Sequence, residues 1–223
     1  MSKGNGNKTK YASSMRFFPE IWGYAAMILF CNIHIITGNL PNELVFFPNL
    51  HGSKAFLSIA THPFVHVSWY HLLLDGAGFF IVYKGLHQPK MMKRLAYVLF
   101  CCIGSVLLPL WYSPYGLAYG LCGLSGIAHG LMAVSALEMS KGKTLKVGIL
   151  CLFVVVTKSI IEAVTGKVIF SFLHFGLMGL PVASTHLGGV LGGCIAYGVL
   201  NEAKIFNSSS NTSNRWDGSV FIK

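Results

Sequence analysis

The residues that could do chemistry in this chain are a serine, an aspartate and several histidines within or beside apolar segments. Ser125 lies in Gly123-Leu124-Ser125-Gly126, at the start of an expected helix. The neighbouring glycines leave Ser125 approachable, and the free N–H groups of a helix N-terminus, here those around Gly123 and Leu124, can stabilise an oxyanion. Serine is a poor nucleophile unless a base takes its proton. His186, near the start of another expected helix, is the natural base, so the pair indicates nucleophilic catalysis.

Glycines recur on the two helices that would carry this pair. Small residues at four-residue spacing let two membrane helices approach closely, and close approach is what a Ser125–His186 hydrogen bond requires. The expected contact residues are Gly126, Gly130, Gly189 and Gly193. The alternative is that these glycines only pack helices and that His186 is a buried polar residue with structural partners.

The composition places these residues in a membrane protein. Of 223 residues, 53% are hydrophobic and 11% are charged, against about 25% charged in a soluble domain. Intrinsic disorder needs the opposite balance, and six cysteines are too sparse for a disulfide scaffold. We therefore expect an all-α, polytopic membrane protein with one membrane domain.

Six apolar segments approach the length that crosses a bilayer. They are Ile21–Thr37, Val67–Val82, Leu95–Trp111, Gly123–Glu138, Val147–Ile161 and Pro181–Leu200. Most of the 17 Lys and Arg residues lie in the two tails and in the second-to-third and fourth-to-fifth connections. The positive-inside rule then predicts that both termini are cytoplasmic. The net charge of +10 is thus assigned to cytoplasmic loops, and no nucleic-acid partner is expected.

This pattern divides the chain into three parts. Residues 1–20 are expected to form a basic cytoplasmic tail, 21–200 the six-helix domain, and 201–223 a disordered cytoplasmic tail. The apolar segment 38–63 is expected to lie in or on the outer leaflet. The connection 165–180 is apolar and contains several glycines, a composition that fits a gate over a water-accessible cavity.

The polar residues inside the expected spans share one depth. Spans two, four and six run from outside to inside, and each carries its polar groups in the first two or three turns. These groups are His66, His71, Asp75, Ser125, His129 and His186. Because such groups are costly in a membrane, their common depth predicts one water-accessible site that faces outward.

Other polar residues are interpreted as structural. Lys158 and Glu162, four residues apart at the outer end of span five, are expected to anchor that end at the interface. For His129 a structural contact with a neighbouring helix is favoured over a role in the site. Three further histidines are expected at the membrane interface or the outer surface: His34, His62 and His174.

Three motifs together resemble the rhomboid intramembrane serine proteases. They are His66-Val-Ser-Trp-Tyr-His71-Leu-Leu-Leu-Asp75, similar to HxxxxHxxxN; Gly123-Leu-Ser125-Gly126, similar to GxSG; and His186-Leu-Gly-Gly189-Val-Leu-Gly-Gly193, similar to HxxGxxxG. The longer strings around His71 and His129 look most like the rhombosortase branch. That branch is bacterial and is associated with surface proteins that carry a C-terminal Gly-Gly sorting tail.

The resemblance implies a Ser125–His186 dyad that works without an aspartate, a metal or another cofactor. Ser125 would attack the scissile carbonyl, and His186 would act as base and then as acid. His71, the side chain at position 75 and the Ser125 N–H would form the oxyanion hole, with His66 in support. The implied partners are the lipid bilayer and single-span membrane substrates. The implied location is a bacterial inner membrane with the site facing outward, and the oligomeric state stays open.

Asp75 departs from the family motif, which has Asn at this position. Asn donates a hydrogen bond through its NH₂ group, whereas an ionised Asp cannot donate. A buried Asp75 could stay protonated and donate, or it could ionise and pair with a histidine; we favour protonation or proton sharing.

Three alternatives remain beside the protease. Asp75 keeps open an inactive relative that binds transmembrane segments. A transporter or proton channel would need polar groups through the full depth of the membrane. A metal site of His66, His71 and His186 is disfavoured, because the five-residue gap puts the first two on poorly aligned helix faces.

Overall fold

The computed structural model describes residues 18–112, 114–169 and 182–212, with side chains in the last range described as far as residue 201. Within these ranges the chain is all-α, as predicted, and holds no β-strand, only an isolated bridge between Phe46 and Leu121. The α-helices are α1 Glu20–Cys31, α2 His34–Thr37, α3 Gly52–Thr61, α4 Trp69–Gly85, α5 Met91–Tyr112, α6 Ser125–Met139, α7 Leu145–Thr165 and α8 Ser184–Thr212. Short 3₁₀ turns are η1 Asn42–Leu44, η2 His62–Phe64, η3 Pro114–Tyr119 and η4 Gly142–Thr144.

Five of the six predicted spans each coincide with one helix, and the first covers α1 and α2. Fewer of them have both the length and the hydropathy of a membrane span. Three stretches of the described chain have both: Glu20–Thr37, Met91–Tyr112 and Gly142–Thr165. A fourth is a pair, Gly52–Phe64 and Trp69–Gly85, bent by 77°. The 15 residues of α6 fall short of the roughly 20 that usually cross a bilayer. Six spans and the cytoplasmic termini therefore stay predictions.

The C-terminal helix is longer than the sequence suggested. α8 runs to Thr212, so the tail that we expected to be disordered from residue 201 is helical over its first part. The physical reason is local: from Asn201 to Thr212 the sequence contains neither Gly nor Pro to end the helix. Residues 213–223 lie outside the described part.

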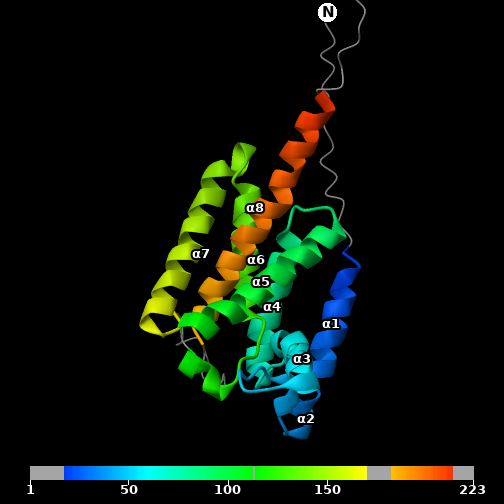
Figure 1. The fold of residues 1–223 in the computed structure, drawn as a ribbon, viewed down its shortest axis with the longest axis vertical. Coiled ribbons are helices and arrows are strands. Elements are labelled where there is room, and N and C mark those ends of the chain that lie inside the picture. Colours follow the sequence, from blue (N-terminus) through cyan, green and yellow to red (C-terminus); the bar gives the residue numbers. More distant parts are fainter. Residues whose placement is uncertain (1–17, 113, 170–181, 213–223) are drawn as a thin grey trace, which may run out of the picture.

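Helix α8 is the centre of the bundle and packs against α5, α6 and α7 (Figure 1). Glycine makes these contacts close on two sides. A Cβ on Gly189 would collide with the carbonyl oxygen of Gly126, and a Cβ on Gly193 with that of Gly130. On the other side Gly188 meets Gly104 of α5, a contact that the sequence did not suggest.

Aromatic side chains join α1 to α4. Tyr24 of α1 packs edge to face against Phe79 and Tyr83 of α4. Next to them the Arg94 guanidinium of α5 forms a buried ion pair with Glu20. Outward-facing apolar side chains on α1, α5 and α7 stay exposed, including Trp22, Trp111 and Phe153. A belt of this kind suits a lipid environment.

Candidate active site

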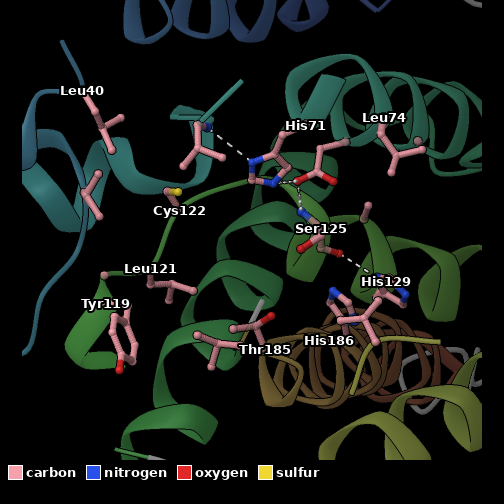
Figure 2. Close-up of a pocket in the computed structure, with 18 of the residues that line it drawn as sticks. Leu40, His71, Leu74, Tyr119, Leu121, Cys122, Ser125, His129, Thr185 and His186 are labelled. Atoms are coloured by element: carbon pink, nitrogen blue, oxygen red, sulfur yellow. Dashed lines mark hydrogen bonds and ion pairs between the residues drawn. The ribbon is translucent and has the colours of Figure 1, made fainter. Parts of the chain in front are cut away.

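A cavity of about 420 Å³ lies among α4, α6, α7 and α8, beside the segment that contains η1. Its polar lining comes from four helices and includes His71, Asp75, Ser125, His129, Lys158 and His186. Figure 2 shows His71, Ser125, His129 and His186 around this space. The structure thus brings together five of the six polar residues that were predicted to share a depth. The sixth, His66, lies behind Asp75.

Ser125 is the first residue of α6, and the turn before it depends on glycine. Gly123 has φ +103°, a left-handed conformation that other residues rarely adopt. A Cβ there would lie 2.8 Å from Asp75 Oδ2 and 2.9 Å from His71 Nε2. The Gly123 N–H donates to the carbonyl of His62 at 3.0 Å. Gly123 therefore lets the α6 N-terminus approach the polar groups of α4, while the Leu124 side chain is fully buried in the apolar core.

Two N–H groups converge on one carboxylate oxygen of Asp75 (Figure 2). The Ser125 N–H donates to Asp75 Oδ2 at 3.1 Å, and His71 Nε2 lies 3.2 Å from the same oxygen. His71 Nδ1 accepts from the Val67 N–H at 3.4 Å, which leaves the proton of a neutral ring on Nε2. Since no side chain at the N-cap position of α6 caps the helix, the Asp75 carboxylate is its cap.

His66 completes the surroundings of Asp75. It lies between η2 and α4, is fully buried, and places Nε2 3.7 Å from Asp75 Oδ2. Nδ1 lies 3.1 Å from the carbonyl oxygen of Phe64 and donates to it, so a neutral ring turns the lone pair of Nε2 toward Asp75, where Nε2 has no hydrogen-bond partner. At 3.7 Å no hydrogen bond joins His66 Nε2 to Asp75 Oδ2.

His186 binds a carboxylate that the sequence placed elsewhere. Its Nδ1 lies 2.7 Å from Glu162 Oε2. The other oxygen, Oε1, accepts from Lys158 Nζ and from the Ile169 N–H, both at 2.7 Å. Glu162 has an exposed fraction of zero. The prediction that Lys158 and Glu162 anchor the interface is therefore wrong, because α7 turns both side chains toward α6 and α8.

His129 makes the helix contact that we favoured and also lines the cavity. Its ring stacks on that of His186, with centroids 4.0 Å apart and planes 11° apart. Nδ1 donates to the carbonyl of Ser125 at 2.8 Å, so Nε2 accepts from Lys158 Nζ at 2.8 Å. His129 therefore ties the nucleophile candidate on α6 to Lys158 on α7.

Ser125 and His186 line the same cavity, yet no hydrogen bond joins Ser125 Oγ to His186 among the described contacts. Because Nδ1 of His186 donates to Glu162, a neutral His186 keeps its lone pair on Nε2. Nε2, the nitrogen that could accept the serine proton, is thus not bonded to Glu162. Apo sites often tighten such contacts only when substrate binds.

Two histidines are buried, His34, which we expected at the membrane interface, and His62, which we expected at the outer surface. His34, the first residue of α2, places its ring nitrogens 2.9 Å from the carbonyl oxygens of Cys31 at the end of α1 and of His66 in the segment before α4. His62 packs under Phe46 and holds the turn at Gly123. Both rings are buried because their nitrogens contact backbone carbonyl oxygens. His174 and most of the proposed gate, residues 170–180, lie outside the described residues.

One group in the described chain has the spacing of a metal site: His129, Glu162 and His186, whose potential ligand atoms lie within 4.8 Å of one another. This is a different set from the one weighed in the sequence. The Lys158 ammonium group already contacts both His129 and Glu162. A fixed positive charge there opposes a metal cation, so we assign no metal to this group.

Glu162 is the residue that the sequence analysis missed. A weak signal was present, since the chain has only seven acidic residues and this one lies in an apolar segment. Its i, i+4 lysine made a surface pair the simpler interpretation. Only the rotation of α7 about its axis distinguishes the two.

Comparison with known families identifies the class. The family model described as the Rhomboid domain matches residues 53–202, well over half of the chain. The chain therefore belongs to the rhomboid family and is an integral membrane protein. No curated protein and no solved structure matches it.

Proposed function

We propose that this protein is an intramembrane serine endopeptidase in which Ser125 is the nucleophile and His186 the general base. The observation that carries the proposal is one arrangement. Ser125 and His186 line a single cavity, and beside Ser125 two N–H donors point at one oxygen. Such converging donors are what a tetrahedral oxyanion requires.

The geometry supports an acyl-transfer sequence. Ser125 Oγ attacks the scissile carbonyl carbon while His186 Nε2 takes its proton, and the carbonyl oxygen becomes an oxyanion. The Ser125 N–H and His71 Nε2–H stabilise this oxyanion. His186 then protonates the leaving amine, which leaves an acyl-enzyme on Ser125. Water, deprotonated by His186, hydrolyses the ester and restores the serine.

Asp75 Oδ2 now occupies the point at which these donors aim. A negative carboxylate and an oxyanion would repel one another at this distance, so both cannot be present as anions. For the reaction, Asp75 must turn away or carry a proton. As a protonated acid it would donate a hydrogen bond, the role that Asn has in the family motif.

We further propose that the substrates are single-span membrane proteins, cut near the outer face of a bacterial inner membrane. The distribution of Lys and Arg supports cytoplasmic termini and an outward site. The strings around His71 and Ser125 support the rhombosortase branch, and so a C-terminal Gly-Gly sorting tail as substrate. The glycine contacts of α6 and α8 support Gly126, Gly130, Gly189 and Gly193 as the residues that bring the dyad together.

A second candidate is an inactive rhomboid that binds transmembrane segments without cutting them. The specific observation in its favour is that Asp75 fills the donor site that an oxyanion would need. Ser125 and His186 would then be remnants, and the cavity would serve only to bind.

A fluorophosphonate probe, which reacts with activated serines, separates the two candidates. The full-length chain, Ser125→Ala and His186→Ala are compared in proteoliposomes, with thermal melting to show that each is folded. Labelling of the wild type alone supports the protease. A folded wild type that is labelled no more than Ser125→Ala supports the inactive relative and overturns the proposal.

A further inference from the structure

One ring nitrogen of His186, Nδ1, is held by a side chain from another helix, α7. Glu162 approaches from α7, with its Oε2 2.7 Å from His186 Nδ1 and an exposed fraction of zero. A dyad needs no such group. An unpaired buried carboxylate would be strongly unfavourable, so the partners of Glu162 indicate its role.

The carboxylate of Glu162 has three donors. Lys158 Nζ and the Ile169 N–H bind Oε1, and His186 Nδ1 binds Oε2. Bonds of this number and kind fix the orientation of the carboxylate, and the nearby ammonium group keeps it ionised. An ionised carboxylate can only accept, so the proton of a neutral His186 must lie on Nδ1.

One face of the His186 ring is covered by a second histidine. His129 stacks on one face at 4.0 Å and is itself fixed by Lys158 Nζ and by the carbonyl of Ser125. Lys158 therefore contacts both the group that stacks on His186 and the group that bonds to it. The stack with His129 of α6 fixes the plane of the His186 ring, and the bond to Glu162 of α7 fixes which nitrogen points where. Nε2 is therefore the nitrogen left free to act as base.

From this geometry we propose that Glu162 is a positioning residue that converts the expected dyad into a Ser125–His186–Glu162 triad, with Lys158 orienting the glutamate. Glu162 selects the Nδ1–H tautomer of His186 and stabilises the imidazolium that forms when Ser125 gives up its proton. It does not touch the substrate. The inference rests on the proposed protease function and adds a third residue to that site.

The test is a kinetic comparison of full-length wild type, Glu162→Gln and Glu162→Asp in proteoliposomes. The matched control is Glu43→Gln, which removes the same charge from an exposed position on η1. The rate of fluorophosphonate labelling at Ser125 is measured with kcat and KM for a single-span reporter substrate. Melting temperatures show whether each variant is folded.

We expect Glu162→Gln to lower kcat and the labelling rate by about 10³-fold, because a neutral amide neither fixes the tautomer nor balances the imidazolium. KM should stay within about twofold of wild type, since the residue does not bind substrate. Glu162→Asp keeps the charge one methylene short and should restore at least about tenfold of the lost rate. Glu43→Gln should behave as wild type.

The outcomes separate this inference from the proposed function. Wild-type labelling that depends on Ser125 and His186, together with wild-type kcat in folded Glu162→Gln, overturns the triad and leaves the protease. Equal loss of rate in Gln and Asp variants that both melt early assigns Glu162 to stability and also overturns it. If Glu162→Gln does not fold, the folded Asp variant decides, since a triad requires its kcat to fall while KM does not.

Discussion

Under the proposed function, replacing Asp75 with Asn should speed substrate cleavage. Asp75 Oδ2 accepts from the Ser125 N–H and from His71 Nε2–H, so both donors are occupied before substrate arrives. Hydrogen bonds to a charged group contribute about 1.5–3 kcal/mol each, against about 0.5–1.5 kcal/mol for a neutral one. The Asn amide oxygen should therefore hold each donor less tightly, by about 1 kcal/mol.

Two such bonds give a difference of about 2 kcal/mol, which corresponds to an increase of about 30-fold in kcat/KM. The Asn NH₂ group can also donate to the oxyanion, as Asp75 can only when protonated. Because Asn does not ionise, the loss of rate that ionisation of Asp75 would impose at high pH should disappear. The pH optimum should accordingly move upward.

The assay is cleavage of a single-span reporter in proteoliposomes, measured as kcat/KM over a pH series, with the labelling rate of Ser125 as a second readout. Asp75→Ala is the matched comparison, since it frees both donors but supplies no new one; its rate should fall below that of Asp75→Asn. Melting temperatures matter here because Asp75 also caps α6, a role that Asn can fill and Ala cannot.

A folded Asp75→Asn protein that cleaves more slowly than wild type, or that keeps the wild-type pH optimum, would refute this reasoning. The carboxylate would then have a role that the donor geometry does not describe. One such role would be to hold His71 or His66 in place through charge.

Three further predictions follow from close contacts. Gly189→Ala should lower the melting temperature and abolish Ser125 labelling, because the added Cβ would collide with the carbonyl oxygen of Gly126. The expected cost is about 1–3 kcal/mol in the free energy of unfolding. Gly198→Ala is the control, since the space around Gly198 is open, and it should do neither. Gly123→Ala should reduce labelling by about 10²-fold in a folded protein, since it strains the turn and its Cβ crowds His71 Nε2 and Asp75 Oδ2. Normal labelling would show that the turn tolerates a side chain. His129→Phe should keep the stack on His186 but lower kcat by about tenfold through loss of the bond to the Ser125 carbonyl, and an unchanged kcat would show that stacking suffices.

Much of the fold could be predicted because its signals are local. Composition and hydropathy indicated an all-α membrane protein, and all six apolar segments are helical, the first as the pair α1 and α2. The end of α8 was missed because a polar sequence can be helical or irregular with little to distinguish them. The burial of His34 and His62 was missed because their partners are backbone carbonyls, which every sequence has.

The sequence by itself determined which residues were candidates: a serine between glycines, a histidine before a glycine repeat, and an aspartate four residues after another histidine. Only the tertiary structure decided what they face. It turned Glu162 from an expected surface anchor into the partner of His186, and it placed the Asp75 carboxylate on the two donors beside Ser125. The physical reason is that spacing along a helix fixes which residues share a face. The rotation of that helix against its neighbours, set here by glycine contacts and by buried charges that need partners, decides where the face points.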